Sequence, residues 1–463
     1  MQLKPRWMAL LVVLLLIVGA CGAETADTST TVAAGATTTT GGTDTTGGDG
    51  STSTTTASEP LEGKIVVWDW HFGNLAEGTF GAAYQKLDEM FLEMHPGVEI
   101  EHVGQPFANY FDALRAALSA GSGPDAAAFF AGPNIESFRE AIIPLDDYIT
   151  PEMVEERAGL SEVSTRGNLD DETWGLPQGY NGNVWYFNKQ LFRDAGLDPE
   201  NPPTTYDELV AAAEALKESG VVPIAGGNQE GFVVSWVWTL LWPGNGTNEE
   251  AIGLGYGDID WDHPTVVKTA EQIKNLFDNY WDPDFASSPL FQGPSIDKFN
   301  LGEAAIFPGL TSGPSASYVE FNAALGEENV GVFHVTGEDE PNYVPFGTAH
   351  AWAITKRAEN PDLVWEYIKF LTGPEAGQLL LDETGMYPNH SEVVVPDDLP
   401  EQVQRFADGI EQWGTAYLPH GWFGPESAEW GPKMQEMLAG GCEIPQCFES
   451  VQQVRDDYLA TLD

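Results

Sequence analysis

The most informative segment of this 463-residue chain is Thr173–Lys189, TWGLPQGYNGNVWYFNK. It is rich in aromatic, glycine and asparagine residues, and it contains no nucleophile–base or acid–base pairing of the kind that covalent catalysis requires. These residue types alone leave open whether the segment reacts with a ligand or only holds one. The segments on either side indicate the kind of protein to which it belongs.

The flanking segments alternate between strand-type and helix-type patterns. Lys64–Trp70 is a β-rich run, Phe80–Met94 has helical periodicity, and Val98–Val103 alternates as a strand. Thr205 and Glu208 form a capping pattern that opens another helix. This alternation predicts parallel α/β construction. The other predicted elements are helices over 110–121, 135–142, 209–219 and 361–373, and strands over 125–130 and 350–355.

From Lys64 onward the chain resembles the family 1 extracellular solute-binding proteins of ABC importers, the maltose-binding type. Six segments carry the resemblance in order, and the fifth has Glu303 where the family usually has Lys. The six are FLEMHPGVEIE (91–101), GSGPDAAAFFAG (121–132), AIIPLDDYI (141–149), the stretch from WGLPQGYNGNVWYFNK to TTYDEL (174–209), FNLGEAAIFPG (299–309), and the run from FGTAHAWAIT to PEAGQLL (346–380).

The resemblance implies a two-lobe α/β protein, the type II periplasmic-binding-protein fold, with a ligand cleft between the lobes and three hinge crossings. The crossings are expected near Gln178–Asn183, Asn329–Thr336 and Leu371–Glu375. Lobe one would then comprise residues 60–178 and 330–372, and lobe two residues 179–329 and 373–463. Gly179 and Gly182 would permit hinge rotation.

Composition restricts the partners. The chain has 20 Lys and Arg against 71 Asp and Glu, a net charge of −51. A surface of this charge repels phosphate backbones, so nucleic acid is excluded as a partner. We expect a monomer without a cofactor.

The N-terminal residues predict export. Lys4 and Arg6 precede a short apolar run, Trp7–Val18, which is typical of a signal peptide over residues 1–20. The sequence VGAC that ends at Cys21 resembles a bacterial lipobox, which favours a lipid-modified Cys21 over a chance cysteine. Residues 21–59 are dominated by Thr, Gly, Ala and Ser, and we expect a disordered tether. The protein is therefore expected at the outer face of the cell membrane or in a periplasm.

The sequence carries only weak signals for a metal site or for catalysis. Cys442 and Cys447 most simply form a disulfide in an exported protein, because their spacing does not suit zinc. Asp258, Asp260 and Asp262 have the opening spacing of a calcium loop, but the glycine and glutamate that should follow are missing. No nucleophile elbow, zinc-protease helix or P-loop is present. We expect no metal and no catalysis.

Candidate ligand residues follow the predicted strands or lie at the hinge. A sugar needs flat aromatic platforms and a few fixed polar groups. Two alternatives stay open: Trp236 and Trp238 alternate with apolar residues and could both belong to a core, Trp238 more so, and Asp125 could instead cap a strand turn. The candidates are Trp70, His71, Phe72, Asp125, Phe130, Gly132, Asn134, Tyr180, Asn181, Trp236, Trp238, Gly309, Thr311, Ser312, Gly347, Thr348, His350 and Trp422.

The sequence thus predicts a lipid-anchored protein that captures a neutral carbohydrate by lobe closure and delivers it to an ABC permease. Three alternatives remain: the same fold with a polyamine, metal-carrier, peptide or glycerol-phosphate-like ligand, a secreted polysaccharide hydrolase, and the binding partner of a sensor.

Overall fold

The computed structural model describes residues 60–336, 344–413 and 426–460. Met1–Ser58 and Glu59–Asp463 separate as two units, and all the described residues belong to the second unit. The predicted signal peptide, the tether, Cys21 and Trp422 lie outside the described residues. No helix in the described ranges is both long and apolar enough to cross a membrane.

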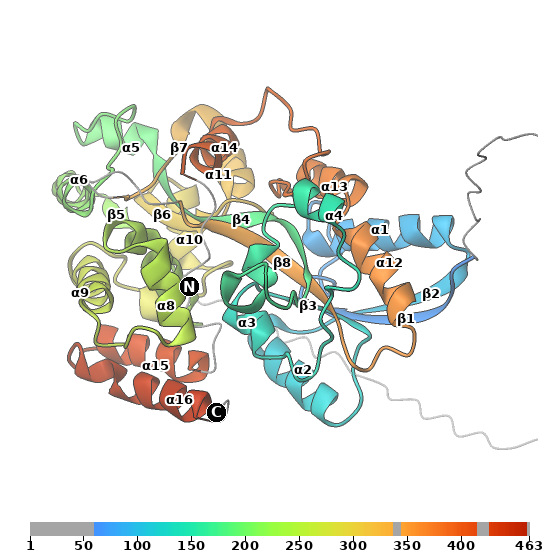
Figure 1. Cartoon of the computed structure of the whole chain (residues 1–463). Coiled ribbons are helices and arrows are strands. Elements are labelled where there is room, and N and C mark those ends of the chain that lie inside the picture. Colours follow the sequence, from blue (N-terminus) through green and yellow to red (C-terminus); the bar gives the residue numbers. More distant parts are fainter. Residues whose placement is uncertain (1–59, 337–343, 414–425, 461–463) are drawn as a thin grey trace, which may run out of the picture. The chain divides into compact units, whose positions relative to one another are not determined.

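The strands form one continuous path of pairing. The order is β2-β1-β3-β8-β4-β6-β5, and β7 pairs with β4 beside that path. Figure 1 shows β1–β3 on one side, β5 and β6 on the other, and β4 and β8 running between them. The strands are β1 (Glu62–Asp69), β2 (Gly97–Gly104), β3 (Ala126–Phe129), β4 (Leu176–Asn188), β5 (Val222–Ile224), β6 (Ala304–Leu310), β7 (Val330–Phe333) and β8 (Phe346–Ile354).

Strand β4, the stretch quoted first, belongs to both halves. Its residues 176–182 pair with β8, and its residues 183–188 pair with β6 and β7. It remains one strand of 13 residues and is buried almost throughout. The first crossing between the lobes therefore lies within a continuous strand, near Gln178–Asn183.

The prediction of parallel pairing is only partly correct. β1 pairs in parallel with β2 and β3, and β5 with β6, but every pairing of β4 and β8 is antiparallel. The physical reason is that β4 carries the chain out of the first lobe and β8 carries it back, so the two strands run in opposite directions.

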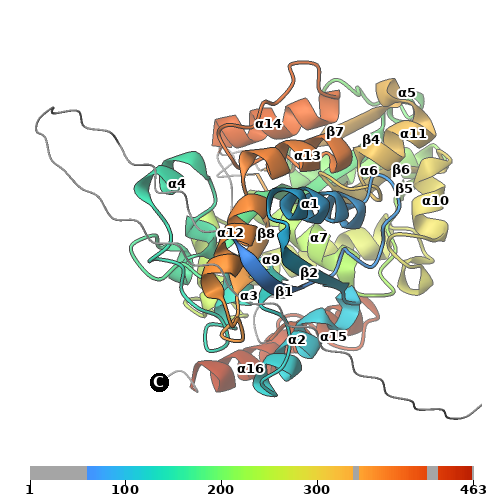
Figure 2. The same cartoon turned by 90° about the vertical axis from the view of Figure 1, so that its right-hand side faces the viewer.

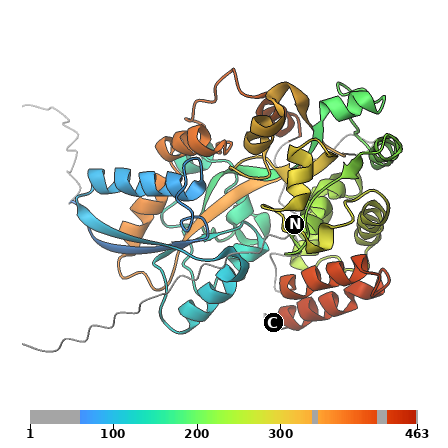
Figure 3. The same cartoon turned by 180° about the vertical axis from the view of Figure 1, so that it is seen from behind.

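Helices cover both lobes. In Figure 2, α1 and α12 lie over β1 and β2, and Figure 3 shows α15 beside α16. The helices are α1 (Phe80–Met94), α2 (Tyr110–Ser119), α3 (Pro133–Glu136), α4 (Pro151–Glu156), α5 (Lys189–Asp194), α6 (Tyr206–Glu218), α7 (Phe232–Leu241), α8 (Asn248–Tyr256), α9 (Pro264–Asn279), α10 (Pro294–Asn300), α11 (Tyr318–Leu325), α12 (Pro361–Leu371), α13 (Pro374–Thr384), α14 (Glu401–Trp413), α15 (Ser427–Leu438) and α16 (Glu449–Leu459).

Local signals predicted some helices well and one poorly. Helix α1 has the predicted bounds, and α6 begins at the capping box of Thr205 and Glu208. The helix predicted over 135–142 is wrong, because α3 ends at Glu136. Beyond it the chain bends so that Ile142 pairs with Thr355 at the edge of the sheet, and this tertiary pairing overrides the local periodicity.

Two separate hydrophobic cores define the lobes and correct two predicted boundaries. The sequence predicts that residues 330–336 belong to the first lobe, but Val330, Val332 and Phe333 pack in the core of the second lobe. It predicts that the segment of helix α13 belongs to the second lobe, but Leu380 of α13 packs in the core of the first lobe. Strand β7 packs against β4, and helix α13 packs against α1; these contacts place each segment in its lobe. The return crossing is therefore β8, and the third crossing follows α13, before α14.

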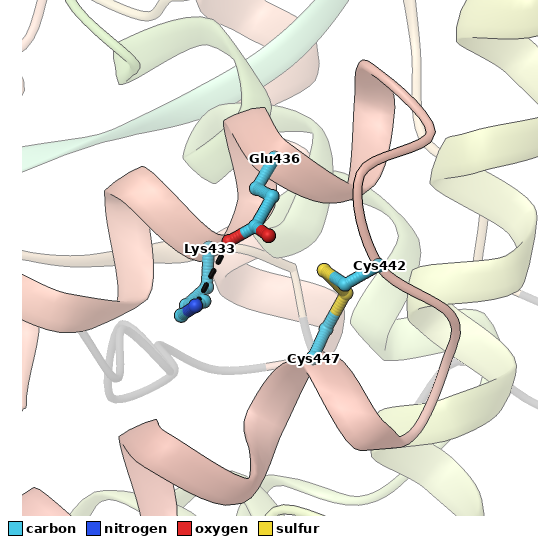
Figure 4. The surroundings of a disulfide bond; sticks show 4 residues. All are labelled: Lys433, Glu436, Cys442 and Cys447. Carbon is cyan, nitrogen blue, oxygen red and sulfur yellow. Dashed lines mark hydrogen bonds and ion pairs between the residues drawn. A yellow bond between two sulfur atoms is a disulfide. The ribbon is translucent and has the colours of Figure 1, made fainter.

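A disulfide joins Cys442 and Cys447 in the turn between α15 and α16, with their Cα atoms 5.4 Å apart. Figure 4 shows it near the ion pair of Lys433 and Glu436, whose Nζ and Oε2 atoms are 2.8 Å apart. Cys447 is 2% exposed and packs into the second core. The bond therefore secures the turn against that core.

Close packing at the crossing gives a test. A Cβ atom added to Gly182 would lie 2.1 Å from the carbonyl oxygen of Pro345. We expect Gly182→Ala to lower the free energy of unfolding by roughly 2–3 kcal/mol, because either the strand pair or the side chain must shift. Urea unfolding measures the change.

The control is Gly431→Ala within α15, where the added Cβ meets no atom within 4 Å. This variant should be neutral or stabilised by up to about 1 kcal/mol. Equal stability of the two variants would contradict the tight crossing.

Candidate functional site

A cavity of about 440 Å³ lies between the two lobes. A larger hollow of about 900 Å³ beside α5 and α6 is lined by the second lobe alone, so lobe closure could not enclose a ligand there. The first lobe lines the interlobe cavity with Trp70, His71, Asn74, Phe80, Phe107, Phe130 and His350. The second lobe and the crossing strand supply Asn181, Gly182, Asn183, Phe232, Ser235, Trp236, Phe291, Gln292, Leu310, Ser312, Gly313, Pro314 and Ser315.

The first-lobe wall is a cluster of aromatic rings centred on Trp70, which directly follows β1. Its ring centroid lies 4.8 Å from that of Phe130 and 5.8 Å from that of Phe107. Behind it, Tyr110 packs edge-on at 5.1 Å, and its hydroxyl group is 3.0 Å from the carbonyl oxygens of Trp68 and Ala128. The contacts fix the indole plane before a ligand arrives.

Asp69 holds the loop that carries this wall. Its Oδ1 accepts the backbone N–H groups of His71 at 3.0 Å and Phe72 at 2.8 Å. The side chain is fully buried, and this burial raises the pKa of Asp69 to about 6 even though nearby His102 lowers it. Asp69 is therefore a positioning residue beneath the cavity.

The opposite wall offers polar groups in fixed positions. Oδ1 of Asn181 accepts a hydrogen bond from the Thr311 hydroxyl at 2.9 Å. Two buried groups on this wall, the Nδ2 atom of Asn183 and the Oγ atom of Ser312, have no hydrogen-bond partner among the described residues. An unpaired buried polar group is costly, so both are suited to a ligand that supplies the missing partner.

Two histidines meet at the first-lobe side of the cavity. Nε2 of His71 and Nε2 of His350 are 3.0 Å apart. Burial lowers the pKa of His350 to about 3. Burial, and to a lesser extent the nearby His350, lower the pKa of His71 well below its usual value. Both rings are neutral near pH 7, so one donates and the other accepts.

The comparisons with known proteins fit this arrangement of two lobes and a cavity. Residues 76–378 match the family described as bacterial extracellular solute-binding protein. The chain belongs to this family. Its members serve ABC importers by binding solutes.

Relatives of this solute-binding protein differ in what their names state. The sn-glycerol-3-phosphate-binding periplasmic protein UgpB of Yersinia pestis is 27% identical over 348 residues, covering 69% of this chain and 73% of that protein. An uncharacterized ABC transporter extracellular-binding protein of Pyrococcus horikoshii is 27% identical over 365 residues, covering 74% and 77%.

Solved structures share the two-lobe fold. A chitin oligosaccharide binding protein has a TM-score of 0.71 at 21% identity and covers 86% of this chain and 98% of its own. The GacH receptor of Streptomyces glaucescens has a TM-score of 0.64 at 20% identity and covers 87% and 99%. The type II binding-protein fold predicted from the sequence is confirmed.

The structure brings some of the predicted ligand residues of this solute-binding protein to the cavity and places others behind it. Phe72 stacks on His102 at 4.0 Å, and Asn134 accepts the N–H of Phe130 at 3.0 Å. Those that line the cavity are Trp70, His71, Phe130, Asn181, Trp236, Ser312 and His350. Those that do not are Phe72, Asp125, Gly132, Asn134, Tyr180, Trp238, Gly309, Thr311, Gly347 and Thr348.

Two of these candidates have structural roles instead. Asp125 accepts the N–H of Val66 at 2.8 Å within the first-lobe sheet, which is the strand-turn role considered as its alternative. Trp238 is 1% exposed and packs on Trp242, Trp261 and Trp430 in the second core. Helical geometry explains the pair at 236 and 238, since residues two apart in α7 point to different sides.

Sequence reasoning missed several aromatic residues of the cavity. Phe107 precedes α2, Phe232 begins α7, and Phe291 lies in the loop before α10. Phe232 and Phe291 follow no predicted strand, the signal on which most candidates depend. Phe107 does follow the predicted strand Val98–Val103, so this signal could have found it. Phe80, Asn74, Gln292 and the 313–315 loop were also missed.

The lobes touch each other around the cavity. The rings of Phe107 and Phe232 are 5.3 Å apart across the lobes. Away from the cavity, Arg166 of the first lobe pairs with Asp258, and its guanidinium lies 4.9 Å from the ring centroid of Tyr256. Each of these contacts joins residues of the two lobes, so moving the lobes apart would break it.

The pKa of Asp69 gives a prediction about pH. Between about pH 4 and pH 6 the folded protein keeps a proton on Asp69 that the unfolded chain has lost, so this group makes folding less favourable as pH rises through that window. Asp69→Asn removes the effect while its amide oxygen still accepts both N–H groups. Relative to wild type, the variant should gain roughly 3 kcal/mol in free energy of unfolding between pH 4 and pH 7.

Urea unfolding at both pH values measures that gain. Asp147→Asn, which removes an exposed carboxylate, is the control. A pH-independent difference for the Asp69 variant would refute the burial argument.

The ion pair between the lobes gives another prediction. Because the Arg166 and Asp258 side chains are 48% and 60% exposed, we expect Arg166→Gln to weaken ligand binding only about 2- to 5-fold at low salt. The part of the effect that comes from the ion pair should vanish at high salt and be absent when Asp258 is already Asn, and any remainder reports the contact with the Tyr256 ring.

Isothermal titration calorimetry with the solute that the protein binds measures these affinities. Lys274→Gln, which removes the ion pair with Asp278 inside the second lobe, is the control and should leave affinity unchanged. An equal loss in both variants would mean that Arg166 does not act through closure.

Proposed function

We propose that this protein is a lipid-anchored receptor that captures a neutral carbohydrate and delivers it to an ABC importer. The proposal rests on the composition of the interlobe cavity. The described residues that line it include no Asp, Glu, Lys or Arg, although the chain contains 71 acidic and 20 basic residues. Aromatic faces and uncharged polar groups match the C–H faces and hydroxyl edge of a sugar.

Charged ligands fit this lining poorly. A phosphate ester such as sn-glycerol-3-phosphate, which UgpB is named for binding, requires cationic side chains or several convergent donors. A polyamine requires carboxylates. Burying either charge against Trp70, Phe130 and Trp236 without a counter-charge would cost several kcal/mol, on the order of the penalty for an unpaired ion.

Capture follows from the way the two lobes divide the site. The aromatic wall around Trp70 belongs to the first lobe, whereas Asn183, Ser312 and Trp236 belong to the second lobe and the crossing strand. A ligand bound to one wall gains the other only when the lobes close. Ligand binding therefore shifts the population toward the closed form by the difference in affinity between the two states.

Delivery requires the protein to stay near its importer. We propose that lipid on Cys21 and the Thr/Gly-rich segment 22–59 tether a monomeric receptor at the outer face of the membrane. The closed lobes then dock on the permease subunits. Tethering replaces free diffusion by a high effective concentration.

A ligand panel tests the proposal. Neutral mono- and oligosaccharides, sn-glycerol-3-phosphate and spermidine are each added to the full chain, and the melting temperature is recorded. A saccharide at one hundred times its dissociation constant should stabilise the fold by roughly 2.7 kcal/mol. Stabilisation by the phosphate ester or the polyamine alone would overturn the carbohydrate assignment.

Phe291 provides a mutational test. Its ring packs edge-on against Trp236 at 5.7 Å, and it is 40% exposed, so truncation should disturb the fold little. We expect Phe291→Ala to raise the dissociation constant of the bound saccharide about 3- to 10-fold. Leu301→Ala, which truncates a 72% exposed side chain outside the cavity lining, is the control. Unchanged affinity in the Phe291 variant would contradict a role for this wall.

A further inference from the structure

We propose that a chain of hydrogen bonds from the crossing strand fixes Nδ1 of His71 as a hydrogen-bond acceptor, so that the cavity selects a ligand that presents a hydroxyl donor to it. This relay consists of Gln178, Tyr84, His350 and His71. The inference rests on the proposed function, because it specifies which chemical group of the neutral ligand the first lobe recognises.

The relay begins with Gln178 on β4, whose amide orientation is fixed from both sides. The indole N–H of Trp352 donates to its Oε1 at 2.9 Å, and its Nε2 donates to the carbonyl oxygen of Leu371. An indole nitrogen can only donate and a carbonyl oxygen can only accept. The position of the amide oxygen is therefore unambiguous.

The hydroxyl group of Tyr84 lies between Gln178 and His350. The hydroxyl donates to Oε1 of Gln178 at 2.7 Å. A tyrosine hydroxyl has one proton, so toward Nδ1 of His350, 3.5 Å away, it presents only a lone pair. A proton on Nδ1 of His350 is the arrangement that satisfies this contact, and it leaves Nε2 of His350 as an acceptor.

The histidine pair then has only one arrangement. Because burial keeps the pKa of His350 and of His71 below its usual value, each neutral ring carries one proton. Nε2 of His350 accepts, so Nε2 of His71, 3.0 Å away, must donate. The remaining ring nitrogen of His71 is consequently unprotonated.

That nitrogen belongs to a ring that lines the cavity, and no described residue donates a hydrogen bond to it. A ligand hydroxyl satisfies it, whereas an ionised phosphate or carboxylate oxygen would bring a lone pair against a lone pair. A deoxy analogue that lacks the matching hydroxyl leaves the acceptor unpaired. Such an analogue should bind about 10-fold more weakly.

Nuclear magnetic resonance of ¹⁵N-labelled histidine side chains tests the relay without any ligand. In wild type, His350 should be protonated on Nδ1 and His71 on Nε2, with signals assigned by single His→Gln variants. In Tyr84→Phe, which keeps the buried ring but removes the hydroxyl, His350 should change to the other tautomer or to a mixture. Tyr367→Phe is the control: its hydroxyl donates to Asp88, outside the relay, so both tautomers should stay.

Binding measurements complete the test. One monodeoxy analogue of the saccharide found in the ligand panel should bind wild type about 10-fold more weakly than the parent sugar, and Tyr84→Phe should reduce that ratio to 3-fold or less. A His71 protonated on Nδ1 in wild type, or a ratio that is unchanged in Tyr84→Phe, would overturn the relay and leave the carbohydrate receptor intact. Binding of a phosphate ester without any neutral saccharide would overturn both.

Discussion

Strand β4 is the constraint on which the rest of the molecule depends, because one run of 13 residues is hydrogen-bonded into both lobes. Its first half pairs with β8, and its second half pairs with β6 and β7. Between the halves lie the residues that face the cavity, Asn181 to Asn183. A cavity wall built on this strand is hydrogen-bonded to both lobes, so both lobes fix its position.

The surface and the interlobe cavity of this chain differ sharply in charge. A net charge of −51 gives the chain a strongly negative electrostatic potential at its surface. The described cavity lining excludes that charge and keeps His71 and His350 neutral by burial. The buried carboxylate of Asp69 accepts hydrogen bonds from two backbone N–H groups beneath the wall. The Asp69 carboxylate therefore holds the loop in place and is not part of the cavity lining.

Much of the fold could be predicted because its signals are local. The helix over Phe80–Met94 and the cap at Thr205 depend on neighbours within one or two turns. The lobe boundaries could not be predicted in this way. Val330–Phe333 and α13 each joined the lobe opposite to the expected one, because apolar packing with β4 and α1, far away in sequence, decided their place.

The sequence by itself determined the class of the protein: alternating strands and helices, six family segments in order, and an aromatic and amide-rich crossing stretch. Tertiary structure alone decided which side chains form the site. His71 meets His350 across 279 residues, and Phe107 meets Phe232 across the lobes. Such pairs depend on strand order and lobe contact, which local periodicity does not encode. For the same reason Trp236 reached the cavity while Trp238, two residues later on the same helix, went into the core.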